Sequence, residues 1–303
     1  MTAATLSDLL RGATARLGDP VAARWVVGEA AGLEAAPLLL GGAASAPSGA
    51  PERVEEMLRR LDAGEPLQHV LGHWGFRTLE LLVDPRALVP RPETELVTGC
   101  VLDELARMRA ERAARGGAGG GSARRFPVVL DLGTGSGAIS CAIVAEDGDA
   151  RVVAIERSPD ALELARENRA RLPASAAARL FLAAGHWYEG VAELLARTGL
   201  GPTVDCIVSN PPYISESEWS GLDPVVRDHD PYDALVAGPT GLEGVEAVVT
   251  GAPGLLARRG VIVVEIAPWQ AGSACDLARA AGARDVAVEQ DLAGRARLVR
   301  ARW

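Results

Sequence analysis

The chain has 303 residues, of which 48% are hydrophobic, and its formal net charge is -9. This length allows one large or two modest domains with a full hydrophobic core. The acidic balance disfavours broad non-specific binding to nucleic acid. The absence of lysine excludes Schiff-base chemistry and a Walker-type phosphate lysine.

The cysteines and histidines predict neither a disulfide framework nor a metal site. The four cysteines are far apart and form no CxxC motif: Cys100, Cys141, Cys206 and Cys275. His69 and His73 have the i, i+4 spacing of a zinc helix, but the glutamate of that motif is missing and Gly72 intervenes. We therefore expect no metal.

The chain shows no sign of membrane insertion or export. It does not begin with a basic region followed by an apolar core, and no apolar run reaches the roughly 20 residues that span a bilayer. We therefore expect a cytoplasmic protein that makes no contact with a membrane.

The first 64 or so residues predict short helices. Asp19-Pro20 is typical of an N-cap followed by proline at the first helical position, and Gly32 stands where a C-cap would. A further helix is predicted from Pro51 to about Asp62. We expect an all-helical N-terminal domain over residues 1–73, which residue types alone leave as either a structural cap or a docking module.

Residues 74–92 predict a β-hairpin linker. Apolar residues alternate here, at Phe76, Leu79, Leu81 and Val83. The linker ends in the sequence Val89–Glu95, after which a helix is predicted to about Arg112. The low-complexity segment Gly116–Ser122 then predicts a flexible loop rather than a phosphate site, since no strand precedes it and no lysine follows.

From Val128 onward apolar strands alternate with helices, which is the pattern of an α/β domain. One helix is predicted to begin at Ser158-Pro159, a cap followed by proline. The candidate strands are Val128–Leu132, Val152–Ile155, Arg179–Ala183, Asp205–Ser209, Val261–Glu265, Val286–Glu289 and Arg297–Arg300.

A glycine-rich turn, Asp131–Gly137, ends the first of these strands and opens a helix. Glycines let the backbone turn tightly and approach a ligand, and the helix amides face the same place. Glu156 ends the next strand and can accept two hydrogen bonds from a ribose diol. The spacing is GxGxG, and Asp131 would repel a pyrophosphate but can lie near a sulfonium. This favours S-adenosylmethionine over NAD, with a purely structural turn as the other interpretation.

The tetrad Asn210-Pro211-Pro212-Tyr213 follows the apolar run Cys206–Ser209 at the carboxyl end of a predicted buried strand. The prolines have no N–H, so this backbone offers carbonyl acceptors, flanked by an amide side chain and an aromatic ring. Open α/β sheets bind ligands at this end. The tetrad suits a flat NH₂ group held by Asn210 and a proline carbonyl and covered by Tyr213, or else is a proline-rich turn.

Two further features remain open on residue types alone. Trp187, after the third strand, can stack on adenine or belong to the core or the surface. The segment between Pro212 and Gly241 is predicted to be the longest loop without secondary structure, and it is rich in acidic residues. A long loop of this kind is either a lid or binding loop, or a solvated acidic loop.

Taken together, these motifs resemble the class I S-adenosylmethionine-dependent methyltransferases that methylate nitrogen. Further matches resemble the peptide chain release factor glutamine N5-methyltransferase family: Gly64-Glu65-Pro66-Leu67-Gln68, Val89-Pro90-Arg91-Pro92-Glu93-Thr94-Glu95, Val208-Ser209-Asn210-Pro211-Pro212-Tyr213-Ile214 and Asp291-Leu292-Ala293-Gly294-Arg295. The similarity covers nearly the whole chain. The tetrad by itself is less specific, because adenine and cytosine amino-methyltransferases share it.

The resemblance implies a Rossmann-like, doubly wound, mostly parallel seven-stranded sheet over residues 93–303, with the helical domain docking the substrate. It implies S-adenosylmethionine as cofactor, S-adenosylhomocysteine as product, and the glutamine of a Gly-Gly-Gln motif in release factors as substrate. The implied cofactor-binding residues are Gly133, Thr134, Gly135, Ser136, Gly137, Glu156, Trp187 and Asn210. The implied catalytic residues are Asn210, Pro211, Pro212 and Tyr213.

The sequence departs from the family pattern at three places. Glu156 stands where the family usually has aspartate, His186 where an acidic residue usually precedes the tryptophan, and Ala296 where a more polar residue usually precedes Arg297. A glutamate still suits a ribose diol.

Other functions fit the sequence less well. A glutamine methyltransferase acting on a ribosomal protein shares the tetrad, but Arg91–Thr94 is more similar to the release-factor enzymes. A DNA adenine N6-methyltransferase would need a basic target-recognition region. An NAD oxidoreductase is disfavoured by the glycine spacing, and a non-catalytic binding protein would not need the tetrad. We expect a monomer that does not bind nucleic acid directly.

Overall fold

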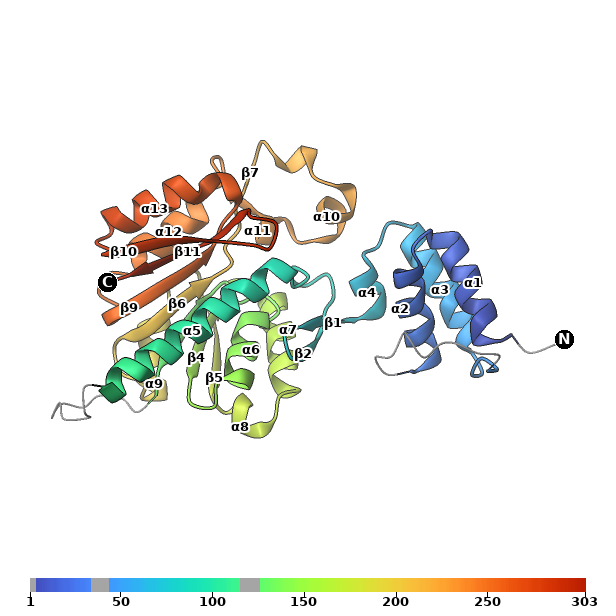
Figure 1. The fold of residues 1–303 in the computed structure, drawn as a ribbon, viewed down its shortest axis with the longest axis horizontal. Coiled ribbons are helices and arrows are strands. Elements are labelled where there is room, and N and C mark those ends of the chain that lie inside the picture. The colour runs from blue at the N-terminus through green and yellow to red at the C-terminus, as the bar shows by residue number, and fades with distance from the viewer. Residues whose placement is uncertain (1–3, 34–43, 115–125) are drawn as a thin grey trace. The chain divides into compact units, whose positions relative to one another are not determined.

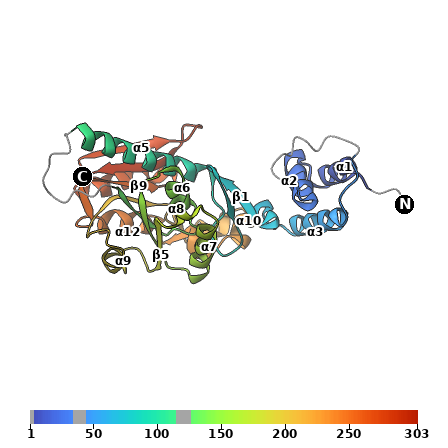
Figure 2. The ribbon, with the colours of Figure 1, turned by 90° about the horizontal axis from the view of Figure 1, so that it is seen from below.

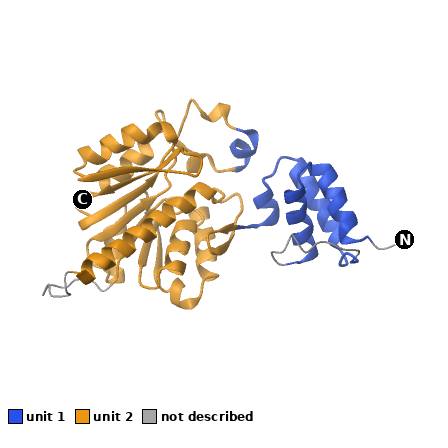
Figure 3. Ribbon diagram, in the orientation of Figure 1, with its two compact units in different colours: residues 1–74, 223–229 blue, residues 75–222, 230–303 orange. Residues whose placement is uncertain are grey.

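The computed structural model describes residues 4–33, 44–114 and 126–303. The chain divides into two compact units (Figure 3). Unit 1 comprises residues 1–74 and 223–229, and unit 2 comprises residues 75–222 and 230–303. The segment Gly116–Ser122, predicted as a flexible loop, lies outside the described residues. The assignment of residues 74–92 to a separate linker stays a prediction.

Unit 1 consists of helices. They are α1 (Leu6–Leu17), α2 (Pro20–Ala31), α3 (Ala50–Asp62), α4 (Leu67–Leu71) and the short α10 (Pro224–His229). The predicted caps of α2 are confirmed: Asp19 accepts a hydrogen bond from the amide of Val21 at 2.7 Å, and Gly32 ends the helix with a φ of 65°. The core of these helices includes Val26, Val27, Val54, Met57 and Leu58.

The predicted β-hairpin is present. Strands β1 (His73–Phe76) and β2 (Leu79–Leu82) pair, and Phe76 is fully buried. A single buried amide, Asn168 in α7 (Pro159–Ala170), holds the hairpin: it accepts from the amide of Leu82 at 2.7 Å and donates to the Leu82 carbonyl at 3.1 Å. Asn168 also donates to the carbonyl of Ser136 at 2.9 Å, so the hairpin and the glycine-rich turn are fixed to the same helix.

All seven predicted strands of unit 2 are confirmed and lie in one sheet (Figure 1). They are β3 (Val128–Leu132), β4 (Arg151–Glu156), β5 (Leu180–Ala184), β6 (Val204–Ser209), β9 (Leu256–Glu265), β10 (Asp285–Gln290) and β11 (Ala296–Arg302). The order is β10-β11-β9-β6-β3-β4-β5, parallel except for β11, which is antiparallel to both neighbours. The doubly wound, mostly parallel sheet is therefore confirmed.

Helices cover both faces of this sheet (Figures 1 and 2). One face packs against α5 (Pro92–Ala114), α6 (Ala138–Glu146) and α8 (Ala174–Ala177), with α7 beside α6. The other face packs against α9 (Val191–Thr198), α12 (Glu243–Gly251) and α13 (Ala271–Ala280). Burial of both faces explains why the central strands are continuous apolar runs. Among the described helices, none is both long and apolar enough to cross a bilayer.

The strand order reverses at β3. The chain runs outward from β3 through β4 to β5, and then returns to place β6 on the other side of β3. A buried hydrogen bond from Ser209 Oγ to the carbonyl of Leu132, at 2.7 Å, joins the ends of β6 and β3. Ligands of open α/β sheets bind at such a reversal. The glycine-rich turn and the tetrad are the two segments that leave the sheet there.

The prediction of a loop without secondary structure between Pro212 and Gly241 is wrong. This segment contains the parallel strand pair β7 (Ile214–Ser215) and β8 (Val236–Gly238), together with the short helices η2 (Trp219–Gly221), α10 and α11 (Tyr232–Leu235). These elements have two to six residues. They are too short to show a hydrophobic period in the sequence.

Candidate cofactor and substrate site

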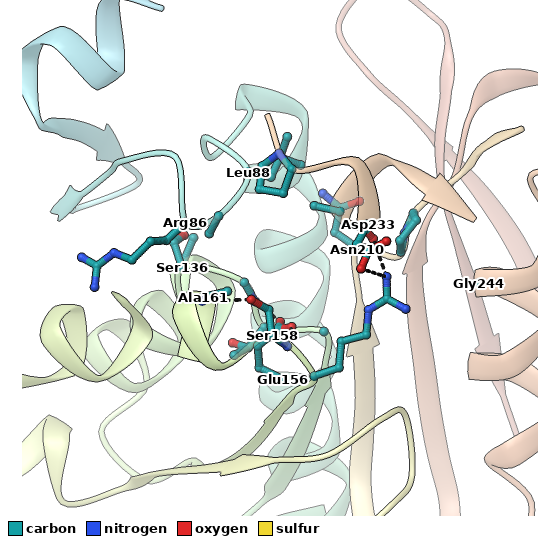
Figure 4. A pocket seen from close by; sticks show the side chains of 18 of the residues that line it. Arg86, Leu88, Ser136, Glu156, Ser158, Ala161, Asn210, Asp233 and Gly244 are labelled. Atoms are coloured by element: carbon teal, nitrogen blue, oxygen red, sulfur yellow. Dashed lines mark hydrogen bonds and ion pairs between the residues drawn. The ribbon is translucent and has the colours of Figure 1, made fainter. Parts of the chain in front are cut away.

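A cavity of about 610 Å³ lies where β3, β4 and β6 end, entirely within unit 2 (Figure 4). Its walls come from the segment before α5, the glycine-rich turn, the ends of β4 and β5, the tetrad and the segment around α11. Lining residues include Arg86, Pro90, Arg91, Thr94, Gly133, Thr134, Gly135, Ser136, Glu156, Arg157, Ser158, His186, Trp187, Asn210, Pro212, Tyr232, Asp233, Glu243 and Gly244.

The glycine-rich turn forms one wall of the cavity with backbone alone. Gly133, Gly135 and Gly137 all have positive φ, between 57° and 83°, which side chains rarely adopt. A Cβ built at Gly133 or Gly135 would meet no atom within 4 Å, so the space above the turn is open. This wall therefore offers room to a ligand, as a nucleoside cofactor requires. The amides of Gly133 and Thr134 already donate to the carbonyl of Ile155, and that of Gly137 to the carbonyl of Thr134, so these bonds hold the turn itself.

Asp131 does not face the cavity, in contrast to our expectation of a carboxylate near the cofactor. It is fully buried, and its Oδ2 accepts hydrogen bonds from Ser140 Oγ at 2.6 Å and Thr134 Oγ1 at 2.7 Å. Side chains alternate along β3, so Asp131 points to the face covered by α6, which carries Ser140. Burial raises the pKa of Asp131 to about 6, although these hydroxyls oppose the shift. Asp131 thus holds the turn in shape.

Glu156 lines the cavity and fixes two backbone segments at once. Its Oε2 accepts from the amide of Gly135 at 2.8 Å, and its Oε1 accepts from the amide of Ser158 at 2.9 Å. The side chain is 7% exposed. Each oxygen retains a lone pair, so the carboxylate can still accept from a diol. Figure 4 shows Glu156 and Ser158 close together beside the cavity.

Trp187 lies in the wall formed by the segment after β5. Its backbone has a φ of 52°, an unusual value for a tryptophan. The ring lies against that of His186, with centroids 5.6 Å apart, and both residues line the cavity. Gly185 precedes them in a crowded turn, where a Cβ would lie 2.6 Å from the carbonyl of Glu189. The strained backbone and the crowding fix where the Trp187 ring lies.

Only part of the tetrad lines the cavity. Asn210 and Pro212 do, whereas Pro211 and Tyr213 are not among its lining residues. Burial raises the pKa of the Tyr213 hydroxyl to about 12, so Tyr213 is neutral at physiological pH. Asn210 donates through Nδ2 to Thr94 Oγ1 at 3.1 Å, which leaves its Oδ1 for another partner.

Several residues that sequence reasoning missed hold the tetrad in place. Gln270 donates through Nε2 to the carbonyls of Gly241, at 2.7 Å, and Tyr213, at 3.2 Å. A Cβ on Gly244 would lie 2.7 Å from the carbonyl of Pro212 and 2.9 Å from Pro211 Cβ, so only glycine fits. A glycine in the first turn of a helix, as at Gly244, could have indicated close packing. Nothing in the sequence links Gln270 to the tetrad, because it lies 57 residues from Tyr213.

The fold and the glycine-rich turn agree with comparisons to known proteins. A model of the methyltransferase domain matches residues 127–180, and a model of the PrmC N-terminal domain matches residues 8–72. The catalytic domain of hMettl16, solved in complex with the MAT2A 3'UTR hairpin 6, has a TM-score of 0.53 at 13% identity over 74% of each chain. Human methyltransferase 10 domain containing protein has a TM-score of 0.50 at 15% identity, over 74% of this chain and 87% of that one. The molecule is a class I methyltransferase, a class whose methyl donor is S-adenosylmethionine.

Similar sequences narrow this class. Release factor glutamine methyltransferase of Streptomyces coelicolor is 39% identical over 251 residues, covering 82% of this chain and 80% of that protein. The protein of the same name from Deinococcus radiodurans is 38% identical over 303 residues, covering 98% of both. That of Cereibacter sphaeroides is 35% identical over 302 residues, again covering 98% of both. The chain belongs to the family of release factor glutamine methyltransferases.

The packing of Gly244 against the tetrad gives a test of this geometry. We expect Gly244→Ala to lower the free energy of unfolding by about 1–3 kcal/mol, because the added methyl has to displace the backbone of Pro212. Gly272→Ala is the matched control: Gly272 is also the second residue of its helix, and its Cβ would meet no atom within 4 Å. The control should be neutral or stabilising by up to about 1 kcal/mol. Urea unfolding of both variants measures this, and equal stabilities would contradict the packing.

Proposed function

We propose that this chain transfers the methyl group of S-adenosylmethionine to the side-chain amide nitrogen, N5, of the glutamine in the Gly-Gly-Gln motif of peptide chain release factors. One observation carries the proposal: in a chain of this family, Asn210 lines the cavity beside the glycine-rich turn and commits its NH₂ group to Thr94. A side-chain carbonyl oxygen therefore remains to accept an N–H from a substrate amide.

The lining residues fit the cofactor, and different residues would bind different parts of it. Glu156 would accept hydrogen bonds from the ribose hydroxyls, the Gly133–Gly137 backbone would leave room for the cofactor to lie against it, and Trp187 would contact the base. When bound, the cofactor supplies a methyl group activated by a sulfonium. The chain's own residues have to bring the substrate nitrogen to that methyl group and orient it.

Asn210 would do this by accepting one N–H through Oδ1, and the resemblance to the family gives the second N–H to the carbonyl of Pro211, although Pro211 does not line the cavity. An amide nitrogen is a poor nucleophile because its lone pair is delocalised, so two acceptors that hold both N–H groups fix the direction in which the nitrogen reacts. As the new C–N bond forms, the nitrogen becomes more positive, and these hydrogen bonds strengthen in the transition state. Tyr213 would cover the plane of the amide. No general base among these residues is required before the transfer: the methyl–sulfur bond breaks as the C–N bond forms, S-adenosylhomocysteine is released, and the nitrogen then loses one proton to water.

The direct test is mass spectrometry of release factors incubated with the purified chain and S-adenosylmethionine. We expect one added methyl group on the glutamine of the Gly-Gly-Gln motif. Parallel incubations with ribosomal proteins and with duplex DNA should show no transfer. Methylation of either, with unmodified release factors, would contradict the proposal.

The chemical role of Asn210 predicts a loss of rate rather than of cofactor binding. Asn210→Ala should lower kcat by roughly 10²–10³-fold, as for loss of one transition-state hydrogen-bonding group. Asn210→Asp should also fail, because the new carboxylate oxygen replaces the NH₂ group that donates to Thr94. Steady-state kinetics with intact release factor measure both. Methylation by Asn210→Ala at nearly the wild-type rate would remove Asn210 from the mechanism.

The role of Glu156 predicts a loss of cofactor affinity. Glu156→Ala removes the acceptor for the ribose and also frees the amides of Gly135 and Ser158, so binding of S-adenosylmethionine should weaken by about 1.5–3 kcal/mol. Glu163→Ala, an exposed change on the neighbouring α7, should leave affinity unaltered. Calorimetry should also show S-adenosylhomocysteine binding and no NAD binding. An unchanged affinity in Glu156→Ala would contradict the assignment.

We also propose that the helical domain docks the release factor, since the PrmC N-terminal domain model matches it and the cofactor cavity is built without it. Removing residues 1–73 should then reduce turnover of intact release factor more than turnover of a short Gly-Gly-Gln peptide. Equal losses on both substrates would indicate a structural role only. That the enzyme works as a monomer stays a prediction.

A further inference from the structure

A chain of three hydrogen-bonded side chains runs from the cavity into the interior of unit 2. Asn210 Nδ2 donates to Thr94 Oγ1 at 3.1 Å, and Thr94 Oγ1 donates to Glu265 Oε2 at 2.8 Å. Asn210 and Thr94 line the cavity, whereas Glu265 is only 2% exposed and is not among the lining residues. The methyl transfer described above uses Thr94 only as the acceptor for the Asn210 NH₂ group and gives no role to Glu265.

The three residues come from three rigid elements. Thr94 lies in the first turn of α5, Asn210 follows β6 directly, and Glu265 is the last residue of β9. Strands β6 and β9 are parallel neighbours with Ser209 paired to Val264, so Asn210 and Glu265 are the next residues along the same register. Thr94 reaches both from the helix that covers them. The distances between these three side chains are therefore set by a helix and two strand ends rather than by a loop.

The direction of these hydrogen bonds is fixed, because a hydroxyl can donate only one hydrogen bond. An ionised carboxylate can only accept hydrogen bonds, so the Thr94 hydroxyl has to donate its hydrogen bond to Glu265. The lone pairs of Thr94 are then left to accept, and the group of Asn210 that can donate to them is its NH₂. This fixes one of the two flips of the Asn210 amide, the one that leaves Oδ1 free. If Glu265 were protonated, it could donate to Thr94, and Thr94 could then donate to Oδ1 of the opposite flip.

The surroundings of Glu265 make this switch accessible near neutral pH. Burial raises the pKa of the Glu265 carboxyl to about 7, opposed by the hydrogen bond from Thr94. Glu93 on α5 adds to the rise and Arg297 on β11 opposes it, and Tyr213 after β6 lies close enough to interact with the charge. Because the folded-state pKa is raised, the ionised form that orients Thr94 is lost as the pH falls through about 7.

We propose that Thr94 and Glu265 are positioning residues that hold the Asn210 amide with Oδ1 toward the cavity, where this oxygen accepts an N–H of the substrate glutamine. The inference rests on the proposed function and extends it: the two residues act through Asn210 and do not touch the reacting atoms.

The first test separates the hydroxyl of Thr94 from its shape, in the full-length protein under single-turnover conditions with release factor and S-adenosylmethionine. Thr94→Val keeps the shape and loses the hydrogen bonds, so the methylation rate should fall by about 10- to 100-fold. Thr94→Ser keeps the hydroxyl and should stay within about threefold of wild type. Thr98→Val is the matched control, because Thr98 is equally buried one turn further along α5, where it donates only to the Thr94 carbonyl at 3.3 Å. It too should stay within about threefold.

Two further readouts exclude a merely structural effect. Affinity for S-adenosylmethionine, measured by calorimetry, should agree within about threefold among all these variants, because the cofactor wall is untouched. Thr94→Val should unfold at a lower midpoint than Thr98→Val, because it loses two hydrogen bonds, one of them to a buried carboxylate, so all rates are measured well below the lower midpoint.

The second test uses pH. The single-turnover rate of the wild type should fall on the acid side with an apparent pKa near 7. Glu265→Gln should lower the rate at high pH and abolish this acid limb, because a neutral amide can either donate to Thr94 or accept from it and so no longer fixes one direction. An acid limb that is unchanged in Glu265→Gln would overturn the role of Glu265.

The outcomes of these tests distinguish the two proposals. Absence of methylation by the wild type would overturn the proposed function and this inference with it. Methylation by the wild type and by Thr94→Val at equal rates would overturn the inference alone. The inference would also fail, with the proposed function intact, if Thr94→Ser were as slow as Thr94→Val or if Thr98→Val were equally slow.

Discussion

The site depends on the reversal of strand order at β3. Because β4 lies on one side of β3 and β6 on the other, three chain segments leave the sheet at one edge and cannot continue as strands. The buried bond from Ser209 to the carbonyl of Leu132 joins two of these strand ends immediately before the glycine-rich turn and the tetrad begin. Parallel pairing therefore sets the separation between the glycine-rich turn and the tetrad before any side chain of the site contributes.

Much of this fold could be predicted because its signals are local. The strands are apolar runs, and caps such as Asp19 and Ser158 mark helix starts within four residues. The pair β7 and β8 could not be predicted, because strands of two and three residues contain no full alternation. The orientation of Asp131 was missed for another reason: its strand is buried on both faces, so the sequence does not tell which face leads to the cavity and which to α6.

Residues that line the cavity were predictable from the sequence, but the partners that hold them in place were not. Glu156 and Asn210 stand directly at strand ends, where residue type and position together indicate a ligand. Their partners are distant in sequence: Asn210 is 116 residues from Thr94, and Thr94 is 171 residues from Glu265. No periodicity or short motif links such positions. Thr94 belongs to the motif Val89–Glu95, which the sequence did single out. Its hydrogen bonds to Asn210 and Glu265 form because α5 lies across the ends of β6 and β9.

Polar groups in and around the cavity keep its walls ordered before a ligand binds. Glu156 uses both oxygens to hold backbone amides, Asp131 uses one oxygen to hold two hydroxyls, and Gln270 holds the carbonyls of Tyr213 and Gly241. Glu156 and Gln270 thereby fix backbone that would otherwise have to be ordered when a ligand binds, and such ordering opposes binding. In the proposed mechanism the substrate nitrogen gains positive charge as the C–N bond forms, so an acceptor that is already oriented would favour the transition state over the bound substrate. The buried polar groups of this domain therefore keep the cavity walls in one arrangement before a ligand binds.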